Sequence, residues 1–171
     1  MRSRGLSKSR ILSSLQCPKR LYLETYHREL QEDSPDREAR FAAGHVVGGL
    51  ARTRYPGGHL IQHADDLNSA LQETEALLAK DGDVVLFEAT LQHQGVLFRS
   101  DVLVRKSGSI RLVEVKSSTK VKNAHHQDCA IQLWVMRSAG YGVDAIEVHI
   151  SITSSYIRAM AITRGYSSTS M

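Results

Sequence analysis

Hydrophobic residues recur along this chain with two different periods, and each period predicts a different kind of element. Where apolar positions are three and four residues apart, they form one face of a helix. The helices predicted in this way begin after Ser7, at Pro18 and at Asp36 or Arg37, and two more span Asp65–Lys80 and residues 124–139. Ser7 is a good N-cap residue, and proline is accepted in the first turn of a helix.

Elsewhere apolar and polar residues alternate with a period of two, or form short apolar runs, and both patterns are typical of strands. The predicted strands are residues 60–64, 84–94, 96–99, 101–105, 110–115, 143–153 and 154–163. The mixture of elements predicts a single α/β domain over residues 1–165, with a mixed central sheet flanked by helices. Residues 166–171 are expected to form a flexible tail.

The segments 101–105 and 110–115 predict a β-hairpin with a polar, glycine-containing turn between them. Asp101 opens the first strand, while Glu114 and Lys116 lie two residues apart in the second and therefore point to the same face. Carboxylates beside an ammonium group suit a divalent cation such as Mg²⁺, which prefers oxygen ligands. The alternative is a cross-strand charge pair on a solvated sheet face.

The spacing Asp-x12-Glu-x-Lys resembles the motif of the PD-(D/E)XK nuclease superfamily. The segment Leu6–Leu23, which ends in Cys-Pro-Lys-Arg-Leu-Tyr-Leu, resembles the N-terminus of RecB-like nucleases of the CRISPR-adaptation kind. The Gly-His-x-x-Gly pattern at residues 44–48 resembles a helix of the same nucleases that carries a histidine. The order of these motifs, completed by a helix with Gln132, is more specific than any one of them. The resemblance extends to about Ile152 and implies a restriction-endonuclease-like core.

The resemblance also implies a site for Mg²⁺ or Mn²⁺. Asp101 and Glu114 would bind the ion, and the backbone carbonyl of Val115 and the imidazole of His45 would complete its ligands. Because imidazole is the softer ligand, His45 would favour Mn²⁺. Glu88, a carboxylate inside an apolar strand, is either an additional acidic residue of the site or a structural partner for an arginine.

Two further residues are implied as catalytic. Lys116 would position or deprotonate the attacking water, or neutralise charge that builds up on the phosphate. Gln132 would orient Lys116 or a substrate phosphate. Relatives often carry a tyrosine four residues after this glutamine, and Met136 stands there instead, so half of that motif is absent.

The cysteines bear on a second cofactor. Some relatives hold an iron–sulfur cluster with a cysteine at the position of Cys17 and three more near the C-terminus, but the C-terminal three are missing here and Cys129 lies elsewhere. Such clusters need four thiolates, so no iron–sulfur cluster is expected. Cys17 is instead expected to be a small buried side chain.

Two expectations concern packing. Gly44 and Gly48 lie on one helix face, where their cost to the helix predicts a close backbone approach beside His45. The last helix is expected to face the core through Ala130, Ile131, Trp134 and Val135.

The chain has 171 residues and a formal net charge of +4, and its basic residues cluster near the N-terminus and after the hairpin. Such clusters suit a polyanion, and Lys19, Arg20, Lys120 and Lys122 are expected to contact nucleic acid. The alternative is a basic surface with no role in binding.

No apolar run has the length of a membrane span, and two cysteines do not make a disulfide framework, so a cytoplasmic protein is expected. The sequence therefore predicts a metal-dependent DNA nuclease, exonuclease-like in acting on DNA ends or single strands. The alternative is an inactive nucleic-acid-binding or structural module of a larger nuclease assembly. Protein partners or a homo-oligomer are compatible with either interpretation.

Overall fold

The computed structural model describes residues 6–31, 35–63, 65–152 and 155–163. Helices and strands follow one another as the two periods of the sequence predict. The elements are β1 (Leu6–Ser7), α1 (Lys8–Gln16), α2 (Pro18–Tyr26), the 3₁₀ turn η1 (Arg28–Leu30), α3 (Pro35–Thr53), β2 (His59–Leu60), α4 (Leu67–Ala79), β3 (Val84–His93), β4 (Val96–Lys106), β5 (Ser109–Lys116), α5 (Asn123–Ser138), β6 (Val143–Ile152) and β7 (Ser155–Thr163).

The strands form one mixed sheet in the order β2-β3-β4-β5-β6-β7, and β1 pairs with the start of β4. Strands β3, β4 and β5 are antiparallel neighbours, whereas β5 and β6 are parallel and are connected through α5. Parallel neighbours need such a crossover, because a tight turn cannot connect them. The predicted α/β class, a mixed sheet flanked by helices, is confirmed.

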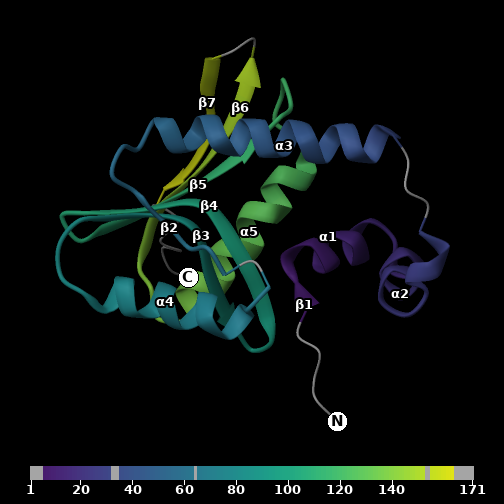
Figure 1. The fold of residues 1–171 in the computed structure, drawn as a ribbon, viewed down its shortest axis with the longest axis horizontal. Coiled ribbons are helices and arrows are strands. Elements are labelled where there is room, and N and C mark those ends of the chain that lie inside the picture. The colour runs from purple at the N-terminus through teal and green to yellow at the C-terminus, as the bar shows by residue number, and fades with distance from the viewer. Residues whose placement is uncertain (1–5, 32–34, 64, 153–154, 164–171) are drawn as a thin grey trace, which may run out of the picture.

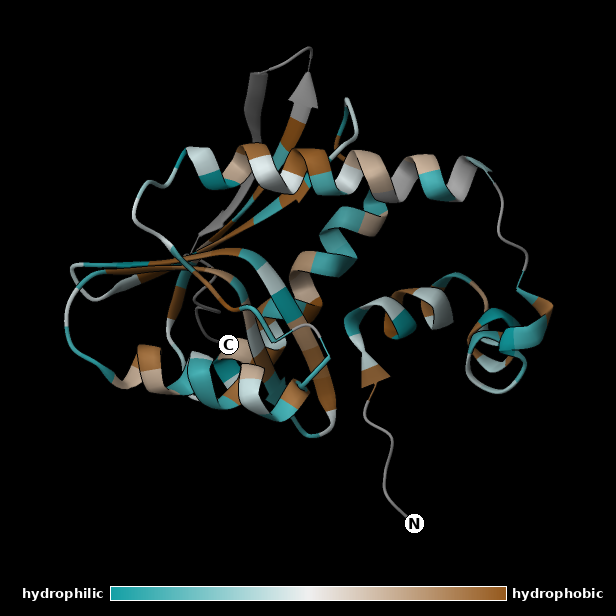
Figure 2. Cartoon of the chain, in the orientation of Figure 1, coloured by the Kyte–Doolittle hydropathy of each residue, from teal (hydrophilic) through white to brown (hydrophobic). Residues whose placement is uncertain are grey.

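Helices cover both faces of this sheet (Figure 1). On one face, Ala51 of α3 packs with Phe87, Val102 and Val113. On the other face, residues of α4 and α5 pack on a larger apolar cluster that includes Leu86, Leu103, Leu112, Leu133 and Ile146. Figure 2 shows hydrophobic residues concentrated along the central strands, while each helix carries both kinds. Helices α1 and α2 lie beside the sheet, where α1 contacts α5 and β4.

Local sequence signals set several boundaries as predicted. The Ser7 side chain accepts the Arg10 N–H and caps α1, and Pro18 stands in the first turn of α2. The hairpin is longer than predicted, because Lys106 and Ser109 still pair. The connecting turn is Ser107-Gly108, with φ of 50° and 79°. Positive φ at both residues is the feature of a type I′ turn, which matches the twist of paired strands.

The buried face of α5 differs from the prediction. Ala130 is exposed, and the Trp134 side chain is 44% exposed. The buried residues are His125, Asp128, Cys129, Gln132, Leu133, Val135 and Met136. These positions also recur at helical spacing, so the helix is rotated away from its most apolar stripe. Polar side chains therefore lie inside, over β5.

Two other packing expectations are wrong. Cys17, expected to be buried, is exposed, whereas Cys129 lies in the core. Among the described residues, a Cβ atom at Gly44 or Gly48 would meet nothing within 4 Å, so no close backbone approach seen there explains these glycines. The glycine that packing requires is Gly58, where a Cβ would collide with the ring of Phe87.

No helix in the described part of the chain is long and apolar enough to cross a membrane. The tail predicted at residues 166–171 lies outside the described residues.

Candidate active site

The end of the β4–β5 ladder positions Asp101. Backbone pairing between these strands runs from Lys106↔Ser109 to Val102↔Val113. Beyond this pair, a side-chain hydrogen bond takes the place of backbone pairing. The Oδ2 atom of Asp101 accepts the N–H of Val115 at 2.6 Å. The carboxylate is thereby fixed beside β5, at the point where the two strands separate.

Strand β3 carries an irregularity at the same level. Glu88 has φ 57°, a left-handed conformation that is uncommon outside glycine. In the β3–β4 register it lies opposite Asp101, between the pairs Phe87↔Val102 and Ala89↔Ser100. Leu86 and Ala89, three residues apart, both belong to the core cluster under α5, so the alternation of β3 shifts by one residue at Glu88.

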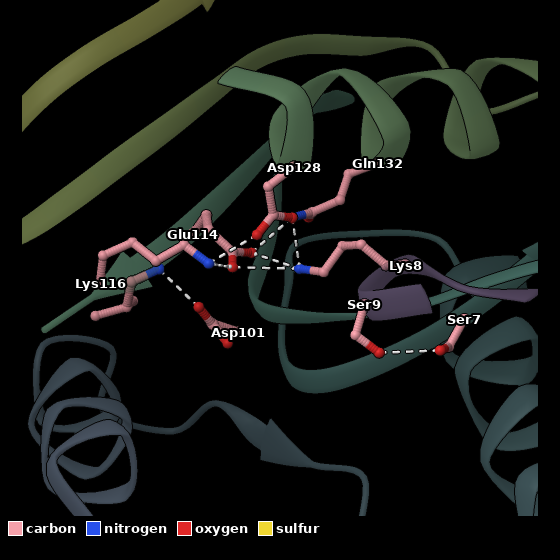
Figure 3. Close-up of polar contacts among 9 residues, drawn as sticks. Ser7, Lys8, Ser9, Asp101, Glu114, Lys116, Asp128 and Gln132 are labelled. Atoms are coloured by element: carbon pink, nitrogen blue, oxygen red, sulfur yellow. Dashed lines mark hydrogen bonds and ion pairs between the residues drawn. The ribbon is translucent and has the colours of Figure 1, made fainter. Parts of the chain in front are cut away.

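Glu114 and Lys116 of β5 face α5, whose first turns carry Asp128 and Gln132 one turn apart (Figure 3). The Gln132 amide donates to Glu114 Oε2 at 2.6 Å and to Asp128 Oδ1 at 2.9 Å. Lys116 Nζ contacts Glu114 Oε1 at 2.5 Å and Asp128 Oδ2 at 2.7 Å. Glu114, Asp128 and Gln132 are almost completely buried.

A second ammonium group enters this cluster from the N-terminal segment. Lys8, the first residue of α1, places its Nζ 2.7 Å from Asp128 Oδ1 and 3.1 Å from Glu114 Oε2. Figure 3 shows Lys8 and Lys116 reaching Glu114 from opposite sides. We call the six residues Lys8, Asp101, Glu114, Lys116, Asp128 and Gln132 the charge cluster.

The charge cluster contains three carboxylates and two ammonium groups, so it is one positive charge short of neutrality. The pKa of Asp101 responds to this imbalance. Burial, and then the negative charge of Glu114, raise the pKa of Asp101 to about 8. At neutral pH in the absence of another cation, a proton on Asp101 therefore supplies the missing charge.

The other charges of the cluster hold one another in their ionised forms. Burial alone would lower the pKa of Lys116, but the attraction of Glu114 and Asp128 outweighs it and raises the pKa above its usual range. The pKa of Lys8 is raised for the same reasons. Burial alone would raise the pKa of Asp128, but the two lysines keep it below its usual range.

Five of the residues singled out in the sequence come together here. They are Asp101, Glu114, Val115, Lys116 and Gln132, the whole implied site except its histidine. His45 is exposed on α3, and no described contact joins it to Asp101 or Glu114. Glu88 is half-buried, and within the described residues its carboxylate has no arginine partner.

The four basic residues expected to contact nucleic acid are all exposed. Lys19 and Arg20 lie on α2, where Arg20 pairs with Glu24 at 2.6 Å. Lys120 and Lys122 lie in the segment between β5 and α5, and Lys122 is the N-cap residue of α5. Each group is therefore adjacent in the chain to an element that carries part of the charge cluster, α1 in one case and β5 and α5 in the other.

Sequence reasoning missed Lys8 and Asp128. Asp128 precedes Gln132 by one helical turn, and this spacing was the available signal, because residues four apart share a helix face. Lys8 belongs to the segment that resembles the RecB-like N-terminus, but it lies 106 residues from Glu114, and nothing in that segment predicts their contact.

No protein-family model matches this chain, and a comparison with curated proteins finds no match. Within the described residues, no three His, Cys, Asp or Glu side chains converge in the way that a preformed metal site requires.

We expect Asp101→Asn to stabilise the metal-free protein, by an amount that grows from about pH 4 to about pH 9. The folded pKa of about 8 lies above the usual 3.8, so folding takes up a proton in this window and wild-type stability falls as the pH rises. Asparagine is never charged, and its Oδ1 can still accept the Val115 N–H. Thermal melting in EDTA across this range measures the difference.

The control for this prediction is Asp81→Asn, which neutralises an exposed aspartate in the turn after α4. It should leave the pH profile unchanged. If Asp101→Asn instead destabilised the protein at the alkaline end, the ionised form of Asp101 would not be unfavourable in the folded state, and the prediction would be wrong.

Proposed function

We propose that this chain is a metal-dependent DNA nuclease of the RecB-like PD-(D/E)XK kind. One observation carries the proposal: Asp101, Glu114 and Lys116 gather with a buried glutamine into a cluster that lacks one positive charge. Buried carboxylates without full compensation cost stability, and perturbed pKa values of this kind are typical of functional sites. A purely structural cluster would be better served by equal numbers of opposite charges.

The donor atoms fit a hard divalent cation. Asp101 has one oxygen on the Val115 amide, which leaves the other for a ligand. Together with Glu114 and the Val115 carbonyl it would hold Mg²⁺ or Mn²⁺, since these ions take one or two carboxylates and fill their shells with water and phosphate oxygen. When bound, such an ion polarises the phosphoryl oxygen and lowers the pKa of coordinated water. His45 as a further ligand stays a prediction.

The surroundings of Lys116 favour one of the roles that the sequence left open. Because its pKa is raised, the ammonium group stays protonated and is a poor base. Lys116 then acts by neutralising negative charge that develops on the scissile phosphate. Asp128 holds the ammonium group in place, and Gln132 orients Glu114 from the buried side.

The proposed substrate is DNA, at ends or in single strands, and the proposed setting is the cytoplasm. Exposed Lys19, Arg20, Lys120 and Lys122 would contact phosphates on either side of the cluster. Protein partners or self-association remain part of the proposal, since a larger assembly would extend these basic surfaces.

A second candidate function has an observation of its own. All four carboxylate oxygens of Glu114 and Asp128 already accept contacts from Lys8, Lys116 or Gln132. Carboxylates whose oxygens are all occupied in this way have no free position for a metal ion. This favours an inactive module with a nucleic-acid-binding or structural role. This candidate predicts DNA binding without hydrolysis.

Incubation of the protein with end-labelled single- and double-stranded DNA separates the two functions. We expect cleavage with Mn²⁺ or Mg²⁺, none in EDTA, and none with Asp101→Asn, while all three samples bind DNA in gel shifts. Binding without cleavage under every metal condition would overturn the nuclease and support the inactive module.

A further inference from the structure

We propose that Lys8 is an internal counter-ion of Glu114 that leaves when a divalent cation binds, so that the start of α1 moves away from the charge cluster. This inference rests on the metal site of the proposed function. It adds a residue, Lys8, and a coupling between metal binding and the N-terminal helix that the motif residues do not imply.

The first observation is how completely Lys8 is committed to the cluster. Its Nζ lies 3.2 and 3.1 Å from the two oxygens of Glu114 and 2.7 Å from Asp128 Oδ1, and its side chain is only 16% exposed. A lysine ammonium group is normally hydrated at a surface. Here three carboxylate oxygens replace that water, as the oxygen ligands of a metal ion would.

The second observation is that Lys8 is the less firmly held of the two lysines. Lys116 belongs to a central strand and pairs with Ile150 of β6 through its backbone. Lys8 follows β1, a strand of two residues that pairs with Val96 and Leu97 and donates one further backbone hydrogen bond to Gly95. The backbone of Lys116 is therefore fixed by the sheet, whereas the backbone of Lys8 can move with a short N-terminal element.

Charge makes the two states exclusive. A divalent ion on Glu114 would lie beside the Lys8 ammonium group in a buried place, where like charges repel strongly. Asp101 attracts Lys8 through its charge, but the described hydrogen bonds and ion pairs of Lys8 Nζ go to Glu114 and Asp128, so the ion would use a carboxylate that Lys8 does not contact directly. When Lys8 leaves, Gln132 still holds Glu114, and Asp128 still holds Lys116.

The coupling is reciprocal, since two ligands that exclude each other weaken each other equally. Any contact that pulls α1 outward therefore raises the affinity for metal. The released lysine would add its charge to exposed Lys19 and Arg20 of the following helix. The N-terminal segment thus links metal binding to the basic surface beside the cluster.

Calorimetric titration with Mn²⁺ tests the exchange in wild type, Lys8→Met, Lys80→Met and Asp101→Asn. Methionine keeps the unbranched stem and removes the charge. We expect Lys8→Met to bind Mn²⁺ roughly tenfold or more tightly than wild type, within the usual range of coupling between sites. Lys80→Met, which removes an exposed charge at the end of α4, should match wild type, and Asp101→Asn should not bind.

Amide hydrogen exchange of α1 gives a readout that a change in local charge alone would not move. In wild type, exchange over Lys8–Gln16 should quicken when Mn²⁺ is added, and in Asp101→Asn it should not change. In Lys8→Met, exchange should already be fast without the metal. Unchanged exchange in metal-bound wild type would overturn the displacement of α1.

The outcomes separate this inference from the proposed function. Equal or weaker Mn²⁺ binding by Lys8→Met, with Asp101→Asn inactive in binding, would overturn the role of Lys8 and leave the metal site standing. Binding by Lys8→Met but not by wild type would support the exchange strongly. Failure of both proteins to bind Mn²⁺ would overturn the metal site and this inference together.

Discussion

Exchanging Lys116 for Met in the proposed nuclease is expected to slow DNA cleavage by roughly a hundred- to a thousandfold, the usual effect of losing one preorganised charge at a developing anion. The ammonium group is held by Glu114 and Asp128 in a place that is 25% exposed. It is therefore fixed before substrate arrives. Methionine fills the same space without the charge, and single-turnover cleavage with Mn²⁺ measures the difference.

The matched control is Lys120→Met, which removes an exposed lysine four residues further along. It should lower DNA affinity slightly, as one phosphate contact among several, and leave cleavage of bound DNA unchanged. Melting curves check that both variants fold. Wild-type cleavage by Lys116→Met would show that Lys116 is not catalytic and would remove the basis of the Glu-x-Lys interpretation.

The hairpin could be predicted because its information is local. Period-two alternation places Glu114 and Lys116 on one face and Val113 on the other, and the structure confirms this arrangement. The Ser107-Gly108 turn sets the register of the two strands, and this register places Asp101 beside Glu114. Each step depends on residues that are close in sequence.

The inner face of α5 could not be predicted from hydrophobicity, because the charge cluster reverses the usual preference. Asp128 and Gln132 are buried since Lys8, Lys116 and Glu114 satisfy them. The buried face of α5 is therefore rotated away from the face that its apolar residues predict, and Trp134 is left exposed.

A shift in the alternation of β4 between Phe98 and Leu103 could not be predicted either. Phe98 and Leu103 of β4 both lie in the cluster under α5, although they are five positions apart and strict alternation would place them on opposite faces. The shift in β3 at Glu88 accompanies it. Irregularities of this kind depend on how two strands fit together, so neither strand alone predicts them.

Asp128→Ala is expected to lower the free energy of unfolding by about 3–5 kcal/mol, the usual cost of breaking a buried ion pair by removing one partner. Asp128 is 2% exposed and contacts both Lys8 and Lys116 at 2.7 Å. Its loss leaves two largely buried ammonium groups whose one remaining carboxylate in direct contact, among the described residues, is that of Glu114. In a domain of this size the melting temperature should fall by roughly 6–20 °C.

Two further variants make this prediction specific to charge. Asp81→Ala removes an exposed aspartate and should change stability by less than about 0.5 kcal/mol. Asp128→Asn keeps the shape of the side chain but not its charge, so it should lower the free energy of unfolding by most of the amount that Asp128→Ala does. Because the lysines hold the folded pKa of Asp128 below its usual 3.8, its stabilising effect is present above that pH and is lost in stronger acid. The gap between wild type and Asp128→Asn should therefore close as the pH falls, and a gap independent of pH would show that Asp128 stabilises the fold through shape alone.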